Sequence, residues 1–313
     1  MASAAATDQV VLPPLLARLS ASPLGRLGRA VRSDRKAATG LTLLAVFTFF
    51  SLAPGLVARD DPSAEIYAPR LGPSLAHLLG TNSFGEDLFA QVVYGTRESL
   101  VIAVVAGGLA TVLSIAFGLT AASAGGAVDG ILSLFTDVFL VIPTFPLIIV
   151  IAAYTKNPGD WALIAVLVVT GWSYGARTLR VQALSLANRD FVVAARLRGE
   201  RTWRVICSEL LPNMTSLIVA NFFGAALYSV LAAAGIEFVG LGNPTTQSWG
   251  TMLYWAQTEE ALQSGIPLWT VAPGVCVALL GAGFALLNYA FDEIGNPALR
   301  PTRRRPARAA RGS

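Results

Sequence analysis

Long apolar runs alternate with short polar segments along most of the chain. Each run has close to the ~20 residues that a helix needs to cross a bilayer, and lipid offers backbone groups no hydrogen-bond partners, so such runs must be helical. Six runs follow this pattern, at about 38–58, 99–124, 130–154, 160–176, 215–234 and 270–290. The pattern predicts an all-α, polytopic membrane protein with about six transmembrane helices.

Prolines and glycines refine this prediction. Pro143 and Pro146 in the third run predict a kink, as does Pro273 near the start of the sixth. Small residues such as Gly107 and Gly118 in the second run let helix backbones approach closely. We therefore expect a packed bundle rather than separate helices in lipid.

Composition agrees with a membrane protein. Hydrophobic residues make up 54% of the chain and charged residues 13%. Soluble domains carry about 25% charged residues, so the composition argues against a soluble fold.

The distribution of basic residues predicts the orientation. Segment 1–37 has six basic and two acidic residues, segment 177–213 has seven arginines and three acids, and the chain from 291 onward has six arginines and two acids. Segment 59–98 instead has three arginines and six acids, and 235–269 has three acids and no base. Because basic loops stay in the cytoplasm, six crossings place both termini and segment 177–213 inside.

This orientation divides the chain into three parts. We expect a retained cytoplasmic tail at 1–37, a transmembrane domain at 38–290 and a basic cytoplasmic tail at 291–313. No signal-peptide core precedes the first run.

The basic insert, about 177–213, is the most distinctive polar segment. Small Ala194 and Ala195, followed by Gly199, favour a tight helix–turn–helix. The segment has an apolar face at near-helical spacing, formed by Trp203, Val205, Ile206 and Leu210. It also has a basic face, formed by Arg196, Arg198, Arg201 and Arg204. Such a segment either docks in the groove of a partner protein or lies on anionic lipid.

Two polar residues stand inside apolar runs, where they are costly. Asp137 in the third run is either a structural or gate-region partner or a ligand of the substrate. Asn221 in the fifth run either lines a pathway or bridges two helices. No pair of titratable residues has the spacing of a proton relay, which argues against a proton-driven carrier.

Missing motifs narrow the function further. The chain has no G-x-x-x-x-G-K-[ST] phosphate loop and no G-x-S-x-G nucleophile motif. His77 is the only histidine and the two cysteines lie far apart, so no metal-ligand cluster is predicted. We expect this chain to be no enzyme and to bind no cofactor, and any ATPase to be a separate subunit.

Four blocks in order resemble the C-type permease of the dipeptide/oligopeptide/nickel ABC-importer family. Residues 79–100 resemble its LGTD-x-x-GRD and YGAR-x-SL pattern, and 190–213 its EAA coupling loop. Residues 238–250 resemble its FLGLG-x-x-P and SWG pattern, and 292–300 its C-terminal signature. Three positions depart from these patterns: Asn82 replaces an aspartate, Glu86 an arginine, and Val193 a glutamate.

The resemblance implies roles for individual residues. The residues that it places in ATPase coupling are Ala194, Ala195, Gly199, Trp203, Leu211 and Pro212. Those that it places in extracytoplasmic motif loops are Gly80, Thr81, Gly85, Asp87, Gly240, Gly242, Pro244, Trp249 and Gly250.

The resemblance also implies an assembly in the bacterial plasma (inner) membrane. The chain would form half of an alternating-access pathway with a homologous B-type permease. Two ABC ATPase subunits would bind ATP and Mg²⁺, and an extracytoplasmic substrate-binding protein would deliver the substrate. Membrane lipid would surround the spans, and no nucleic acid is involved.

Short peptides are the expected cargo. Oligosaccharides are an alternative, because Trp249, Tyr254 and Trp255 could stack on sugar rings. An ion-coupled carrier or channel is the alternative from a different class.

Overall fold

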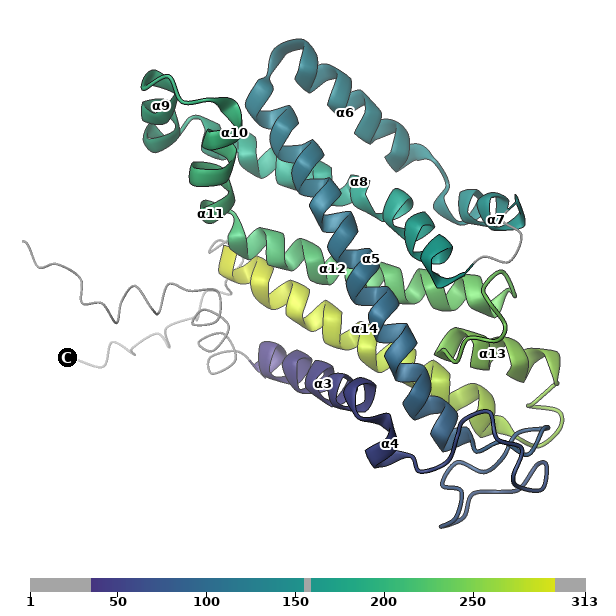
Figure 1. The fold of residues 1–313 in the computed structure, drawn as a ribbon. Coiled ribbons are helices and arrows are strands. Elements are labelled where there is room, and N and C mark those ends of the chain that lie inside the picture. The colour runs from purple at the N-terminus through teal and green to yellow at the C-terminus, as the bar shows by residue number, and fades with distance from the viewer. Residues whose placement is uncertain (1–34, 155–158, 296–313) are drawn as a thin grey trace, which may run out of the picture.

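The computed structural model describes residues 35–154 and 159–295. These residues form helices and loops without a named strand, and a single isolated bridge pairs Thr81 with Asp87. The prediction of an all-α protein is confirmed for the described part of the chain (Figure 1).

Four helices in the described residues are long and apolar enough to cross a membrane. They are α5 (Leu88–Ala124), α8 (Asp160–Ala187), α12 (Thr215–Phe238) and α14 (Pro267–Gly295). A fifth candidate consists of α6 (Gly126–Val141) and α7 (Thr144–Tyr154), which pass the same test only together. The chain is thus a multi-pass membrane protein.

The first predicted run forms α3 (Arg35–Leu52) and the short α4 (Pro54–Val57). With 18 residues, α3 is not among the four spans and stops six residues before the predicted end. The structure therefore gives four or five spans in the described residues, and does not confirm six. Both predicted tails lie almost wholly outside the described residues.

The predicted kink in the third run is confirmed and is sharp. The axes of α6 and α7 differ by 84°, and Pro143 lies in the two-residue break between them. Pro146 and Pro273 lie inside α7 and α14, and each helix continues through its proline.

Two helices extend 11 residues beyond the predicted apolar runs. Helix α5 begins at Leu88 rather than residue 99, and α8 continues to Ala187 rather than ending at 176. Polar residues at these ends, such as Arg177 and Arg180, break an apolar run without breaking the helix. A helix can extend beyond the hydrocarbon layer, so hydropathy marks the membrane and not the helix end.

Helix α5 packs against α3, α8 and α12, and α12 packs in turn against α14 (Figure 1). Close approaches of small residues hold these pairs together. A Cβ on Gly107 of α5 would lie 2.7 Å from the backbone nitrogen of Ala226 in α12. A Cβ on Gly118 would lie 2.5 Å from the carbonyl oxygen of Ala176 in α8. The predicted small-residue contacts are confirmed.

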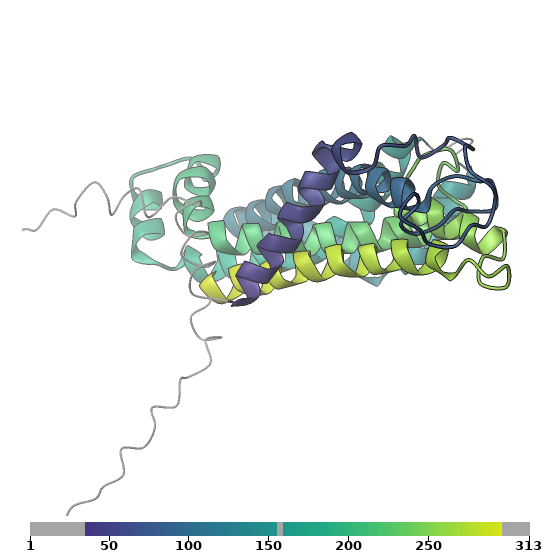
Figure 2. The ribbon, with the colours of Figure 1, turned by 90° about the horizontal axis from the view of Figure 1, so that it is seen from below.

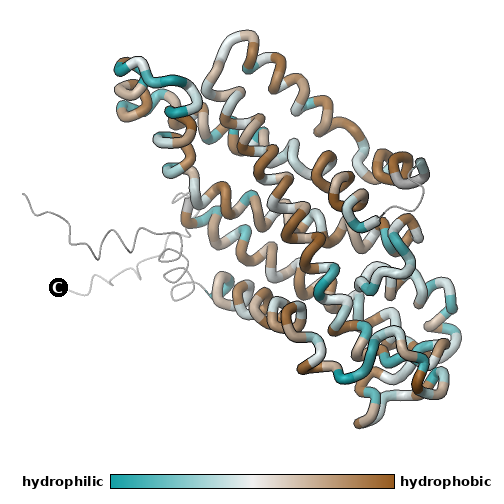
Figure 3. Tube along the Cα trace, viewed as in Figure 1, coloured by the Kyte–Doolittle hydropathy of each residue, from teal (hydrophilic) through white to brown (hydrophobic). Residues whose placement is uncertain are grey.

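The bundle has two polar ends. One carries the short helices α9 (Asp190–Leu197), α10 (Thr202–Val205), η1 (Ile206–Leu210) and α11 (Leu211–Asn213). The other carries the loops around residues 59–87 and 239–266, together with α13 (Trp249–Thr258). Figure 2 shows these groups at opposite ends of the long helices, and Figure 3 shows the apolar stretches between them.

Candidate functional site

The connection between α8 and α12, residues 188–214, forms the coupling segment. It consists of α9, a turn and the three short helical pieces α10, η1 and α11. At the turn, the N–H of Gly199 donates to Arg196 and the N–H of Glu200 donates to Ala195. This pair of bonds needs a residue with positive φ, and Gly199 has φ +77°.

One side of the coupling segment packs on the bundle. Val192, Ala195, Val205 and Leu210 are buried in a cluster with Leu179 of α8 and other residues of α5 and α8. The segment is therefore fixed to the ends of two membrane helices, and a displacement of it would be transmitted to both.

The coupling segment also carries four exposed apolar side chains, Phe191, Val193, Leu197 and Trp203, and we call this set the coupling face. Leu197 is 83% exposed and Trp203 62%. We expected Trp203 on one face with Val205 and Leu210, but it lies outside while they lie inside. Trp203 and Val205 are two positions apart in α10, which is about 200° around a helix, so they point to opposite sides.

The remaining predicted coupling residues divide between these sides. Ala195 is buried and Leu211 half-buried, whereas Ala194, Gly199 and Pro212 are exposed. A Cβ on Gly199 would meet nothing within 4 Å in this chain. The space beside the Cα of Gly199 is therefore open to solvent or to a partner protein.

At the opposite end, the first motif loop folds around two glycines. Gly80 and Gly85 have positive φ, and a Cβ on either would collide with the backbone carbonyl of Leu71 or Tyr67. The buried hydroxyl of Thr81 donates to Ala68 and accepts from the N–H of Leu71, each at 2.8 Å.

Asp87 caps the N-terminus of α5. Its carboxylate accepts from the backbone N–H groups of Phe89 and Ala90, at 3.3 and 3.0 Å. Burial raises the pKa of the Asp87 carboxyl, against the opposing effect of these two hydrogen bonds.

The second motif loop packs around a buried acid that sequence reasoning missed. Glu237, near the end of α12, is 4% exposed and accepts a 2.7 Å hydrogen bond from the hydroxyl of Ser248. A Cβ on Gly250 would collide with its carboxylate, and a Cβ on Gly242 would lie 2.7 Å from its Cγ. The sequence did contain one sign of this buried residue, because Glu237 is a lone acid at the end of an apolar run, just before these glycines.

The other residues of this loop are also structural. Trp249 is fully buried, and its indole N–H donates to the carbonyl of Val92 in α5 at 3.0 Å. Gly240 has φ +83°, and the carbonyl of Pro244 accepts from the indole of Trp255. Trp249 is thus unavailable for stacking on a sugar ring.

A cavity of about 520 Å³ lies among α6, α7, α8, α12 and α14. Its polar lining residues are Thr144, Thr170, Ser173, Tyr174, Thr178, Asn221, Tyr228, Asn288, Tyr289 and Asp292. No lysine or arginine is among the described residues that line it. Hydroxyl and amide groups therefore dominate its polar chemistry.

Asn221 lines this cavity, and its amide donates to the hydroxyl of Thr111 in α5 at 3.4 Å, a long contact that links α12 to α5. Asn288 likewise lines the cavity while donating to the carbonyl of Ala220 at 2.6 Å.

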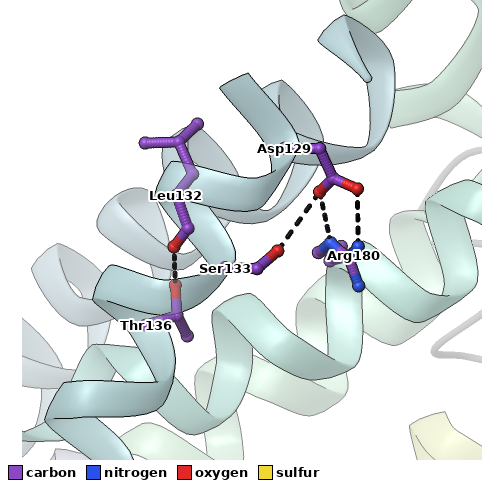
Figure 4. A network of polar contacts seen from close by, with 5 residues as sticks. All are labelled: Asp129, Leu132, Ser133, Thr136 and Arg180. Carbon is purple, nitrogen blue, oxygen red and sulfur yellow. Dashed lines mark hydrogen bonds and ion pairs between the residues drawn. The ribbon is translucent and has the colours of Figure 1, made fainter. Parts of the chain in front are cut away.

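Asp137 lies apart from Asn221, in a separate cavity of about 170 Å³ between α5, α6 and α8. Its carboxylate is 3.8 Å from the guanidinium of Arg177. Nearby, Arg180 of α8 forms two 2.6 Å bonds with Asp129 of α6, which also accepts from Ser133 (Figure 4). Both arginines were expected in a loop, so sequence reasoning did not find these links between α6 and α8.

Long apolar helices around a cavity with polar groups in its lining, together with exposed apolar side chains at one end, are features of a membrane transport subunit. Residues 114–296 match the model of the binding-protein-dependent transport system inner membrane component family. The chain belongs to this family, and its predicted membership of the dipeptide/oligopeptide C-type permeases is confirmed.

Several relatives are similar over most of their length. The dipeptide transport system permease protein DppC of Alkalihalophilus pseudofirmus is 30% identical, over 92% of this chain and 94% of its own. DppC of Bacillus subtilis is 30% identical over 88% and 85%. The oligopeptide transport system permease protein OppC of Mycobacterium bovis is 30% identical over 72% and 78%.

Proposed function

We propose that this chain is the C-type permease subunit of an ATP-driven importer of short peptides in the bacterial inner membrane. It pairs with a homologous permease to enclose the pathway. Two separate ATPase subunits bind ATP and Mg²⁺ and dock on the coupling segment, while an extracytoplasmic binding protein delivers the peptide.

The observation that carries this proposal is the coupling face. An exposed Trp203 and Leu197 beside several arginines suit a protein partner, because large exposed apolar side chains at one place mark an interaction surface. The same segment is anchored on α5 and α8, so it can convey movement of an ATPase to the membrane helices.

The hydroxyl and amide groups of the cavity among the membrane helices support peptides as cargo. These groups can hydrogen-bond peptide N–H and C=O groups, whatever the side chains of the peptide. The printed names of the relatives, dipeptide and oligopeptide permeases, agree with this choice.

The full topology adds α3 and the bent α6–α7 pair to the four long helices, which gives six crossings. An 18-residue helix is about 27 Å long, close to the ~30 Å hydrocarbon core. An even number of crossings puts both termini on the same side as the coupling segment, and the basic residues of these three regions put that side in the cytoplasm.

The test is ATP hydrolysis by the complex assembled with its partner permease, ATPases and binding protein. We expect Leu197→Ser with Trp203→Ser to assemble in the membrane yet lose most of the stimulation by loaded binding protein. Leu52→Ser is the matched control, because Leu52 is 80% exposed on α3. Wild-type stimulation in the double variant would refute docking at the coupling face.

A further inference from the structure

A second cavity lies in the loops at the end opposite the coupling segment. It has a volume of about 360 Å³ and forms between the segment 63–91, the loop 244–247 with α13, and Trp269 of α14. The residues that matter here are Glu65, Phe84, Glu86, Gln247, Trp255 and Trp269. It shares no lining residue with the 520 Å³ cavity among the membrane helices.

A pre-oriented carboxylate lies in its wall. Oε2 of Glu86 accepts hydrogen bonds from the amides of Asn82 and Gln91, at 2.5 and 2.7 Å. Asn82 is itself fixed, because its side-chain oxygen accepts from the backbone N–H groups of Phe84 and Glu86. Within the described residues, Oε1 of Glu86 has no hydrogen-bond donor and remains free to accept one.

The charge of this wall is not neutralised within the described residues. Glu65 adds a second carboxylate, no lysine or arginine lines the cavity, and neither acid forms an ion pair. Phe84 contacts Trp255 and Trp269 edge-on, with ring centroids 6.0 and 6.2 Å away. Aromatic faces attract cations, so both kinds of side chain favour a positively charged occupant.

The small volume and the polar wall of the cavity favour a protein side chain over a free solute. Small-molecule sites measure roughly 300–1,000 Å³ and are mostly apolar. This cavity is near the lower limit and has a largely polar wall, with Ser63 and Glu65 exposed at its rim. A lysine or arginine can place its apolar stem along the aromatic rings and its charged head at Glu86.

We infer that this cavity receives a lysine or arginine side chain of the substrate-binding protein when that protein docks on the permease. The family depends on a binding protein, and the proposed topology exposes this end of the bundle to it. The inference therefore rests on the proposed function. It adds the place of contact and the charge that the partner must present.

The experiment uses the assembled complex in lipid nanodiscs and measures the concentration of loaded binding protein that half-maximally stimulates ATP hydrolysis. We expect Glu86→Gln to raise this concentration about three- to tenfold, because a charge-assisted hydrogen bond is lost. Charge reversal in Glu86→Arg should raise it further. Added salt should weaken the wild type more than Glu86→Gln. The maximal rate should stay unchanged.

Two further variants make the result decisive. Glu260→Gln removes an exposed carboxylate of the same end that does not line the cavity, and should match the wild type. Glu65→Gln leaves the hydrogen bonds of Glu86 intact and should raise the half-maximal concentration about twofold, as expected for an exposed ion pair. Equal concentrations for the wild type, Glu86→Gln and Glu65→Gln would overturn the inference. No stimulation of the wild type would instead contradict the proposed function.

Discussion

The side-chain amide of Asn82 donates a 2.5 Å hydrogen bond to Oε2 of Glu86. These are two of the three positions at which the chain departs from the patterns that it resembles. The first pattern, LGTD-x-x-GRD, has an acid followed by an arginine there, whereas this chain has an amide followed by an acid. The first position is therefore the hydrogen-bond donor in this chain and the second position the acceptor, the reverse of the pattern, and the pair remains complementary.

The first prediction follows from this exchange. Asn82→Asp should lower the melting temperature of the purified protein, because two carboxylates would face each other in a buried loop. Adding Glu86→Arg should restore much of the loss by re-creating an opposite-charge pair. A double-mutant cycle on thermal unfolding measures this coupling. Additive effects of the two changes would show that the positions are independent.

Adjacent glycines in α5 provide the second prediction. Gly107→Ala should destabilise the protein, because its Cβ would lie 2.7 Å from the backbone nitrogen of Ala226. Gly108→Ala is the matched control, since its Cβ would lie 3.9 Å from the ring of Phe222 in α12, an ordinary van der Waals distance. That variant should be neutral or gain up to about 1 kcal/mol from helix propensity. Equal melting temperatures would contradict the close approach of α5 and α12.

The cap of α5 gives a pH-dependent prediction. Asp87→Ala should cost roughly 1 kcal/mol at neutral pH because the cap is lost, whereas Asp87→Asn keeps a capping side chain. The raised pKa of Asp87 means that the folded state binds its proton more tightly than the unfolded state. This contribution to stability is present below the ordinary aspartate pKa and is lost as the pH rises through the folded value.

Thermal unfolding of Asp87→Asn and the wild type at several pH values tests the direction of this pH dependence of stability. The wild type should gain stability relative to Asp87→Asn as the pH falls from 7 toward about 4, the ordinary aspartate range. A difference that stays constant, or changes in the opposite direction, would show that burial does not dominate this carboxyl.

Hydropathy and residue type predicted much of the fold. The runs that became α5, α8, α12 and α14 were recognisable because lipid requires long apolar helices. The break at Pro143 was recognisable because proline interrupts helical hydrogen bonding. The helix ends were not, because α8 continues through Arg177 and Arg180 beyond the apolar run, and a polar residue does not by itself end a helix.

The site was only partly predictable. Gly199 could be placed at a turn because the coupling segment needs a residue with positive φ there. The two-residue spacing of Trp203 and Val205 puts them on opposite sides of a helix, but which of the two is exposed depends on which side packs against Leu179. Glu237, Asp129 and the cavity at Glu86 depend on contacts between distant segments, and one sequence does not report such contacts.

The proposed orientation is tested by cysteine labelling. Cys207 and Cys276 are first replaced by serine, and single cysteines are then placed at Ser74, Ser185 or Gln263. Cysteines at positions 74 and 263 should react with an impermeant reagent from outside, and the one at 185 only after the membrane is opened. External reaction at position 185 would contradict six crossings with cytoplasmic termini.

The central claim, that this chain is the permease of a peptide importer, is tested most directly by peptide uptake. The measurement follows labelled di- to pentapeptides, beside labelled oligosaccharides, in a strain without other peptide importers and with this gene deleted. Peptide uptake should be lost on deletion, return with the wild-type gene, and not return with the Leu197→Ser, Trp203→Ser variant. Unchanged peptide uptake after deletion, with loss of oligosaccharide uptake, would contradict it.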